Sequence, residues 1–300
     1  MRDSPRFRNE ALAVALDAAI VGEGKSHLPL FDLLGRNSGL PGPRANMGVV
    51  AAFAGECAVR GARADKLIVM MATLDADRAP GGTELEILPM CGISAIGERA
   101  ATEPKAHRRM MQLLHECADD LRFRVRDCIP VALARIGQVR GDAFVAELAG
   151  WTNGFFHAAY VLIAMSDPLF MPEINDSAQA VARLDEAFQL AKGATRSTER
   201  YPGYKSLIDA LSTAPGALAT RFGVPVFDAL VAWSTVKEPL LRAAIEKNLT
   251  LTRLTGRQAA EIARVRKALD ASAPLRRDPL TYVGKTRGRG KKGNTILRKR

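Results

Sequence analysis

Asp120-Leu-Arg-Phe-Arg-Val-Arg-Asp-Cys-Ile-Pro-Val-Ala-Leu-Ala-Arg-Ile-Gly137 is the stretch of sequence that decides the fold. Its apolar residues recur every three or four positions, from Val125 through Ile129 to Ile136, which places them on one face of a helix. Asp120 is suited to cap the start of this helix. Gly137 is suited to its end, because glycine adopts the left-handed conformation without steric cost. The stretch therefore predicts an amphipathic helix over 121–137.

The same ending occurs about forty residues earlier in the chain. Ile93-Ser-Ala-Ile-Gly97 aligns with Leu133-Ala-Arg-Ile-Gly137, and each closes a predicted helix. The earlier helix is expected over 84–97, and the helices that precede the two are expected to begin near 64 and 104. A period of about forty residues that contains two helices is typical of stacked helical repeats.

Helical spacing fills most of the remaining chain. Hydrophobic residues make up 47% of the sequence but aromatic residues only 6%. This Ala- and Leu-rich mixture favours helices over strands. Gly35 to Pro43 is expected to form a loop. Further helices are expected over 7–21, 44–59, 64–74, 141–151, 155–165, 176–191, 204–212 and 237–249, with a last one ending near 270.

The decisive stretch resembles the second helix of the HEAT-repeat (armadillo-like α-solenoid) superfamily. That helix reads Asp, a few residues, Val-Arg, small and aliphatic residues, and a closing Ile-Gly; the matching residues here are Asp120, Val125, Arg126, Ala132, Leu133, Ile136 and Gly137. The resemblance covers about 64–165 well and 223–250 loosely. It implies that Asp120 and Arg126 bond along the stack. It is a likeness of fold and implies no activity.

The expected architecture is all-α: an α-solenoid of HEAT-like helical hairpins, with more than half of the residues in helices and essentially no sheet. We expect an N-terminal helical cap and loop over 1–42, a helical repeat body over 43–270 and a basic, flexible C-terminal tail over 271–300. Trp151 and Trp233 each close an aromatic–aliphatic stripe, so both are expected to be buried packing residues.

The sequence gives little support to an enzyme. Some HEAT-like proteins are DNA glycosylases, which carry a catalytic Asp one helical turn after a Trp. Here Phe155 follows Trp151 and Lys237 follows Trp233, so neither position supplies the carboxylate. No phosphate-binding loop or nucleophile elbow occurs at its required spacing.

No cofactor or metal is expected. Metal sites in proteins need clusters of Cys, His or carboxylate ligands. The histidines (His27, His107, His115 and His157) and the cysteines (Cys57, Cys91, Cys117 and Cys128) are too widely spaced in the sequence for such a cluster. The thiols are expected to be buried and reduced, as in a cytoplasmic protein.

The net charge of +11 is concentrated at the C-terminal end. Residues 275–300 hold ten Lys or Arg and one Asp, a net of +9, which leaves 33 basic and 31 acidic residues over 1–274, a net of +2. Basic side chains on a glycine-rich segment suit phosphate contacts, because binding releases counterions and tolerates variable geometry. The predicted nucleic-acid-binding residues are Arg276, Arg277, Lys285, Arg287, Arg289, Lys291, Lys292, Arg298, Lys299 and Arg300.

A membrane span is not expected. Leu148 to Ser166 lacks formal charge and approaches spanning length, but Asn153-Gly154 is a turn signal. This stretch predicts two buried helices around a tight turn.

These observations favour a non-catalytic helical-repeat scaffold that contacts nucleic acid, DNA or RNA, through its basic tail. One alternative is a HEAT-like DNA glycosylase or other DNA-repair enzyme. Another is a protein–protein adaptor without nucleic acid, whose partner would be an acidic protein. A tail that only aids solubility, or that meets an anionic membrane surface, is also compatible with the charge.

Overall fold

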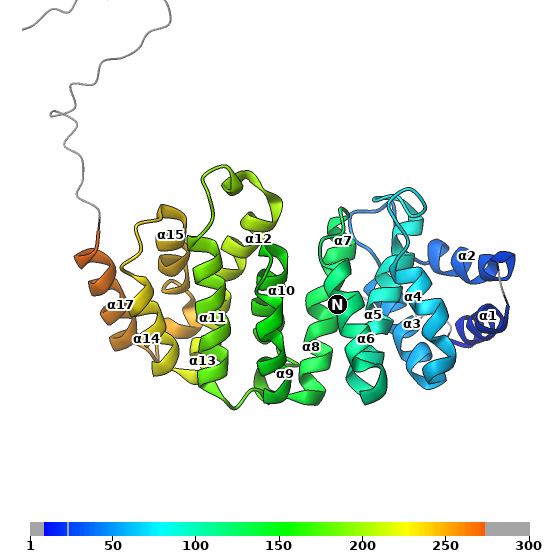
Figure 1. Cartoon of the computed structure of the whole chain (residues 1–300), viewed down its shortest axis with the longest axis horizontal. Helices are drawn as coiled ribbons and strands as arrows, with labels where there is room; N and C mark the ends of the chain where they lie inside the picture. The colour runs from blue at the N-terminus through cyan, green and yellow to red at the C-terminus, as the bar shows by residue number, and fades with distance from the viewer. Residues whose placement is uncertain (1–8, 23, 274–300) are drawn as a thin grey trace, which may run out of the picture.

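The computed structural model describes residues 9–22 and 24–273, and these residues form helices and connecting turns without a strand (Figure 1). The all-α prediction is confirmed for this part of the chain. The α-helices are α1 (Asn9–Val21), α2 (Leu28–Arg36), α3 (Met47–Arg60), α4 (Asp65–Ala72), α5 (Ile87–Thr102), α6 (Pro104–Cys117), α7 (Phe123–Arg126), α8 (Cys128–Arg140), α9 (Asp142–Glu147), α10 (Phe155–Met165), α11 (Ser177–Lys192), α12 (Pro202–Leu211), α13 (Ala214–Phe222), α14 (Val224–Trp233), α15 (Pro239–Asn248), α16 (Thr252–Thr255) and α17 (Ala259–Ala271).

The helices stand side by side along the long axis of the molecule, and they keep their chain order from α1 at one end to α17 at the other (Figure 1). One series packs in the order α3, α5, α8, α10, α12 and α15, each helix on the next. A second series, α9, α11, α14 and α17, packs in the same sequential way, and α4 and α6 pack on α5. Each helix therefore meets helices that are close to it in the sequence.

Several side-chain hydrogen bonds between helical elements join residues 27 to 49 positions apart in the sequence. Arg60 donates to the Ala13 carbonyl 47 residues away, and His107 meets Glu147 40 residues away. Further along the chain, Trp233 donates to Asp185 across 48 residues. These separations are close to the forty-residue offset between the Gly97 and Gly137 segments.

One continuous apolar core runs the length of the described chain, from Leu12 to Leu269. Its central helix is α5, which buries nearly every side chain because helices pack on it from several directions. Trp151 and Trp233 are 5% and 7% exposed, so the prediction that both are buried is confirmed.

Gly97 and Gly137 do not end helices, contrary to the sequence prediction. α5 continues to Thr102 and α8 to Arg140. The left-handed glycine that closes α8 is Gly141, with φ of 54°. The two earlier glycines instead allow close packing: a Cβ on Gly97 would lie 2.7 Å from the Cβ of Ala132, and one on Gly137 would overlap the ring of Phe170.

The predicted helix over 121–137 is divided, and Asp120 does not cap it. α7 ends at Arg126 and α8 begins at Cys128. Pro130 lacks the N–H that would bond to the Arg126 carbonyl, which permits this break. The Asp120 carboxylate accepts from the backbone N–H of Arg122 and pairs with the Arg122 guanidinium.

Other boundaries also differ from the prediction. α2 is not among the predicted helices; it begins at Leu28 and holds Pro29 in its first turn, where a proline is tolerated. α13 is likewise not predicted, and it too holds its proline in the first turn. α15 begins at Pro239, two residues after the predicted start, and Glu238 precedes it without a side-chain cap. The turn at Asn153-Gly154 does separate two short helical segments, as predicted.

Candidate nucleic-acid interface

The ten tail residues predicted to contact nucleic acid lie outside the described residues. They are Arg276, Arg277, Lys285, Arg287, Arg289, Lys291, Lys292, Arg298, Lys299 and Arg300. The described body contains many other basic side chains. Which of them could meet a phosphate depends on which are already held by groups within the protein.

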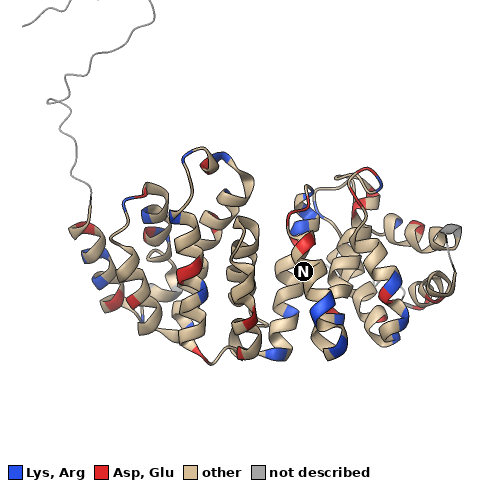
Figure 2. Ribbon diagram, in the orientation of Figure 1, with Lys and Arg blue, Asp and Glu red and all other residues tan. Residues whose placement is uncertain are grey.

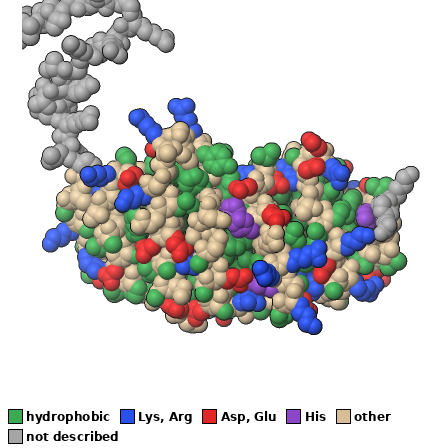
Figure 3. Space-filling view, in the orientation of Figure 1, with side chains coloured by type: hydrophobic (Ala, Val, Ile, Leu, Met, Phe, Trp, Pro, Cys, Tyr) green, Lys and Arg blue, Asp and Glu red, His purple; other side chains and the backbone are tan. Residues whose placement is uncertain are grey.

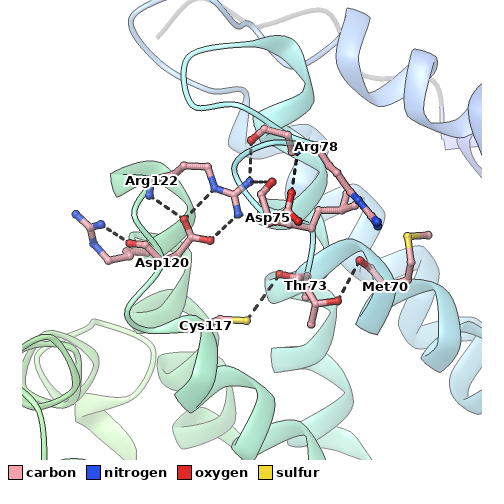
Figure 4. Close-up of polar contacts among 11 residues, drawn as sticks. Met70, Thr73, Asp75, Arg78, Cys117, Asp120 and Arg122 are labelled. Carbon is pink, nitrogen blue, oxygen red and sulfur yellow. Dashed lines mark hydrogen bonds and ion pairs between the residues drawn. The ribbon is translucent and has the colours of Figure 1, made fainter.

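Arg122 is fully engaged inside the molecule (Figure 4). It is 5% exposed, and its Nε and Nη2 donate to the Asp120 carboxylate at 2.8 and 2.5 Å. Its remaining N–H groups reach the loop after α4, at the carbonyls of Leu74 (2.6 Å), Asp75 (3.1 Å) and Ala79 (2.7 Å). All five donors of the guanidinium have acceptors, so Arg122 clamps two consecutive parts of the stack and is not available to a ligand.

Arg126 is engaged differently from the family expectation. It donates to the backbone carbonyl of Asp120 rather than to its carboxylate. Its guanidinium lies 4.4 Å from the ring centroid of Phe156 on α10. Arg126 therefore does link neighbouring helices. Other arginines that bond backbone carbonyls within the protein are Arg60, Arg183, Arg221 and Arg242.

The first two turns of α6 carry a group of basic side chains that have no such partner. Lys105, Arg108 and Arg109 are exposed, and none makes a side-chain hydrogen bond or ion pair with another residue of the described ranges. They lie at i, i+3 and i+4, which places them on one face of the helix. We call these three residues the α6 cationic stripe. Basic positions are visible on α6 in Figure 2, and Figure 3 shows basic side chains gathered on the lower edge of this half of the molecule.

The opposite face of α6 is firmly held. Met110, Met111 and Leu114 are buried in the core. His107 is also buried; its Nδ1 lies 2.7 Å from the Ala100 carbonyl and its Nε2 lies 2.8 Å from the Glu147 carboxylate. These contacts fix the rotation of α6, so the stripe points to solvent. The i, i+3, i+4 spacing of Lys105, Arg108 and Arg109 is present in the sequence, but three basic residues stand out far less there than the ten between 275 and 300.

A second small basic group lies beside the C-terminal end of the described chain. Arg266 and Lys267 on α17 border a hollow of about 440 Å³, with Asp270 as its acidic member. Within the part of the chain that the structure describes, neither basic side chain has an ion-pair partner. This group is close in sequence to the tail.

An open groove of about 550 Å³ crosses α10, α12 and the end of α15. Phe156, Tyr160 and Ile163 form its apolar part, while Lys205 and Lys247 contribute positive charge. Asp127 also borders the groove, and partial burial raises the pKa of its carboxyl above the ordinary value, against the opposing effect of Arg126. Trp151 and Trp233 do not line this groove. It therefore lacks the Trp–carboxylate pairing of the glycosylases.

His115, His157 and Trp151 form an aromatic cluster. The two imidazole centroids lie 4.0 Å apart, and His157 Nε2 lies 2.9 Å from the His115 carbonyl. His157 is 4% exposed, and its Nδ1 is buried without a hydrogen-bond partner. Desolvation lowers the pKa of His157 below its ordinary value of 6.5. Because Nε2 faces a carbonyl acceptor and Nδ1 faces none, this geometry suits neutral His157 as a packing residue.

The four cysteines are free thiols. Burial raises the pKa of Cys57 and Cys128 to about 12 and that of Cys117 to about 11, and it raises the pKa of Cys91 well above its ordinary value. Such thiols are protonated and unreactive at neutral pH. Among the described residues, no group of three His, Cys, Asp or Glu side chains is placed to hold a metal ion.

Within residues 9–22 and 24–273, no helix has both the length and the apolar character needed to cross a bilayer. Comparison of the chain with protein-family models, curated proteins and solved structures gives no match.

Proposed function

We propose that this protein is an α-solenoid scaffold of HEAT-like helical hairpins that contacts nucleic acid through its basic C-terminal tail. The observation that carries the proposal is the separation of charge: residues 275–300 have a net charge of +9 and residues 1–274 have +2. Phosphate contacts by Lys and Arg supply most of the affinity of sequence-independent nucleic-acid binding. A near-neutral body with a strongly basic extension suits this mode of binding.

The arrangement of the body supports the scaffold part of the proposal. Helices pack on their neighbours in chain order, and side-chain bonds between helices such as those of Arg60, His107 and Trp233 span 40 to 48 residues. Contacts restricted to adjacent units are the defining property of solenoid proteins. The close contacts made by Gly97 and Gly137, forty residues apart, fit equivalent positions in successive units.

A salt titration tests the proposal. The full-length protein is expected to bind duplex DNA, single-stranded DNA or RNA at low salt, measured by fluorescence anisotropy. If about six tail cations contact duplex phosphates, log affinity falls against log salt with a slope of about −5 from the tail alone. Little base preference is expected, since phosphate contacts carry no sequence information.

Two full-length variants make the test specific. Replacing the ten tail Lys and Arg by Gln should remove most of the salt-dependent affinity. A tail with the same residues in shuffled order should bind as the parent does, because the contacts depend on charge and not on order. A parent protein without detectable affinity for any of the three nucleic acids at low salt would contradict the proposal.

A protein–protein adaptor is the second candidate function, and one observation favours it. Large apolar side chains are exposed at the groove: Ile163 (41%) lines it, and Tyr201 (51%) lies against Phe156, which also lines it. Exposed apolar groups rimmed by charge are common at protein interfaces. Under this alternative the groove binds an acidic protein segment through Lys205 and Lys247, and substitution of the tail leaves that binding unchanged.

A further inference from the structure

We propose that the α6 cationic stripe is a second phosphate-binding surface, located on the helical body, for the same nucleic acid that the tail contacts. This inference rests on the proposed function, which assigns phosphate contacts only to the tail, and adds to it a second site on the helical body. The stripe is defined by Lys105, Arg108 and Arg109, which share one exposed face of α6.

Several acidic groups on the neighbouring helices are paired within the protein. Asp65 pairs with Arg99 at 2.7 Å, and Glu98 pairs with Arg135 at 2.8 Å. Glu147 meets both His107 and Arg140. Glu103 caps the start of α6 by accepting from the backbone N–H of Lys105, and its carboxylate has no ion-pair partner among the described residues. The stripe therefore sets three cations beside one unpaired carboxylate and keeps a net positive charge.

The position of the stripe opposes helix stability. A helix N-terminus carries partial positive charge, so cations in the first turns are unfavourable there. α6 has no acidic residue in its first turn and Lys105 lies at its second position, so only the carboxylate of the N-cap residue Glu103 offsets this effect. Arg108 and Arg109 are the i+3 and i+4 neighbours of Lys105, and like charges at these spacings repel. An anion bound against this face would relieve both effects.

The chemistry favours a chain of phosphates as the ligand. Three long cationic side chains on one face present donors over more than one helical turn, which a polyanion can engage at once. Guanidinium groups bind phosphate oxygens through paired hydrogen bonds, and two of the three residues are arginines. The rigid anchoring of α6 by His107, Met110 and Leu114 holds the three side chains on the same face before binding.

The test compares two full-length variants of equal charge. One carries Lys105→Gln, Arg108→Gln and Arg109→Gln. The control carries Arg78→Gln, Arg196→Gln and Arg200→Gln, which removes three exposed cations from the connecting loops 73–83 and 193–201. Affinity for a duplex oligonucleotide is measured by anisotropy over a range of salt concentrations, and circular dichroism verifies that both variants keep the helical content of the parent.

The stripe variant is expected to bind about tenfold or more weakly than the control at low salt, and its salt slope should be flatter by up to about 2.7, for three lost phosphate contacts. Equal affinities and slopes for the two variants, with a parent that binds, would overturn this inference and leave the proposed function standing. A parent that does not bind would overturn both. The reverse variant, with Gln112→Lys on the same face, should bind more tightly than the parent.

Discussion

At the scale of single residues, Arg122 and Arg126 lie four positions apart but make different contacts. Arg122 satisfies three backbone carbonyls and a partly buried carboxylate. Arg126 satisfies one carbonyl and covers an aromatic ring. The family resemblance directs attention to Arg126, but the number of buried acceptors identifies Arg122 as the stronger link between consecutive parts of the stack.

Replacing Arg122 by Ala is expected to lower the free energy of unfolding by about 3–5 kcal/mol, because Asp120 is left without its partner in a largely buried position. Arg126→Ala should cost less, about 1–3 kcal/mol. Urea denaturation followed by circular dichroism measures both. Arg122→Lys should also destabilise, since an ammonium group cannot reach acceptors on both sides. Equal stability of the parent and Arg122→Ala would show that the clamp contributes nothing.

His157 predicts a dependence of stability on pH. Its folded-state pKa lies below the ordinary value of 6.5, through desolvation. Below that ordinary value the unfolded chain binds a proton that the folded chain binds less readily, so stability falls as pH decreases. The free energy of unfolding should decrease between pH 7 and pH 5, and the decrease should be smaller in His157→Gln. An equal decrease in the parent and in His157→Gln would contradict this prediction.

At the scale of helices, the sequence predicted most elements because their apolar spacing is strong, but it did not predict how they end. The Ile-Gly segments at Gly97 and Gly137 have a different physical cause from the predicted helix ending. Both glycines lie within helices and meet a neighbouring element at close range. A single sequence does not distinguish a glycine needed for its backbone angle from one needed for its small size, because both uses place it near an apolar face.

Glycine-to-alanine substitutions separate these two causes. Gly137→Ala should destabilise by about 1–3 kcal/mol, because the new methyl group would overlap Phe170. Gly55 lies within α3 and has open space around it, so Gly55→Ala should stabilise by up to about 1 kcal/mol through helix propensity alone. Thermal or urea denaturation of the two variants checks the opposite signs. Stabilisation by Gly137→Ala would mean that the close packing is absent.

At the scale of the whole molecule, the charge of the tail and the core of the body are separate. The described core ends at Leu269. A chain that ends at Pro274 should therefore keep its helical circular dichroism, while the steepness of the salt dependence of DNA binding decreases by about 5. Binding by this shortened chain that equals the parent in affinity and salt dependence would place the main interface on the body.

The basic tail could be predicted from the sequence because its charged residues are contiguous. The α6 cationic stripe could be recognised only from the structure, which shows which basic side chains are unpaired. Net charge over 1–274 is only +2, so unpaired cations are concealed by paired ones. Arg60, Arg99 and Arg108 each add one positive charge to the net charge. However, Arg60 is paired with Asp17 and Arg99 with Asp65, whereas Arg108 is not paired among the described residues. Only the contacts between helices show which side chains remain for a partner. The groove beside Asp127 is hidden for the same reason, since its walls come from separate helices.

The distribution of cysteine has a consequence for observing motion in this protein. Cys57, Cys91, Cys117 and Cys128 lie on α3, α5, α6 and α8, and the chain has no cysteine after them. Cys57, Cys91 and Cys128 are buried, whereas Cys117 is partly exposed, so labelling of the three buried thiols by a thiol-specific reagent reports transient opening of the first half of the molecule and is silent about the second. If adjacent helices open separately, as contacts restricted to neighbours allow, loss of structure near α17 would leave these three thiols unlabelled. Labelling rates compared with amide hydrogen exchange would then show from which end the stack begins to open.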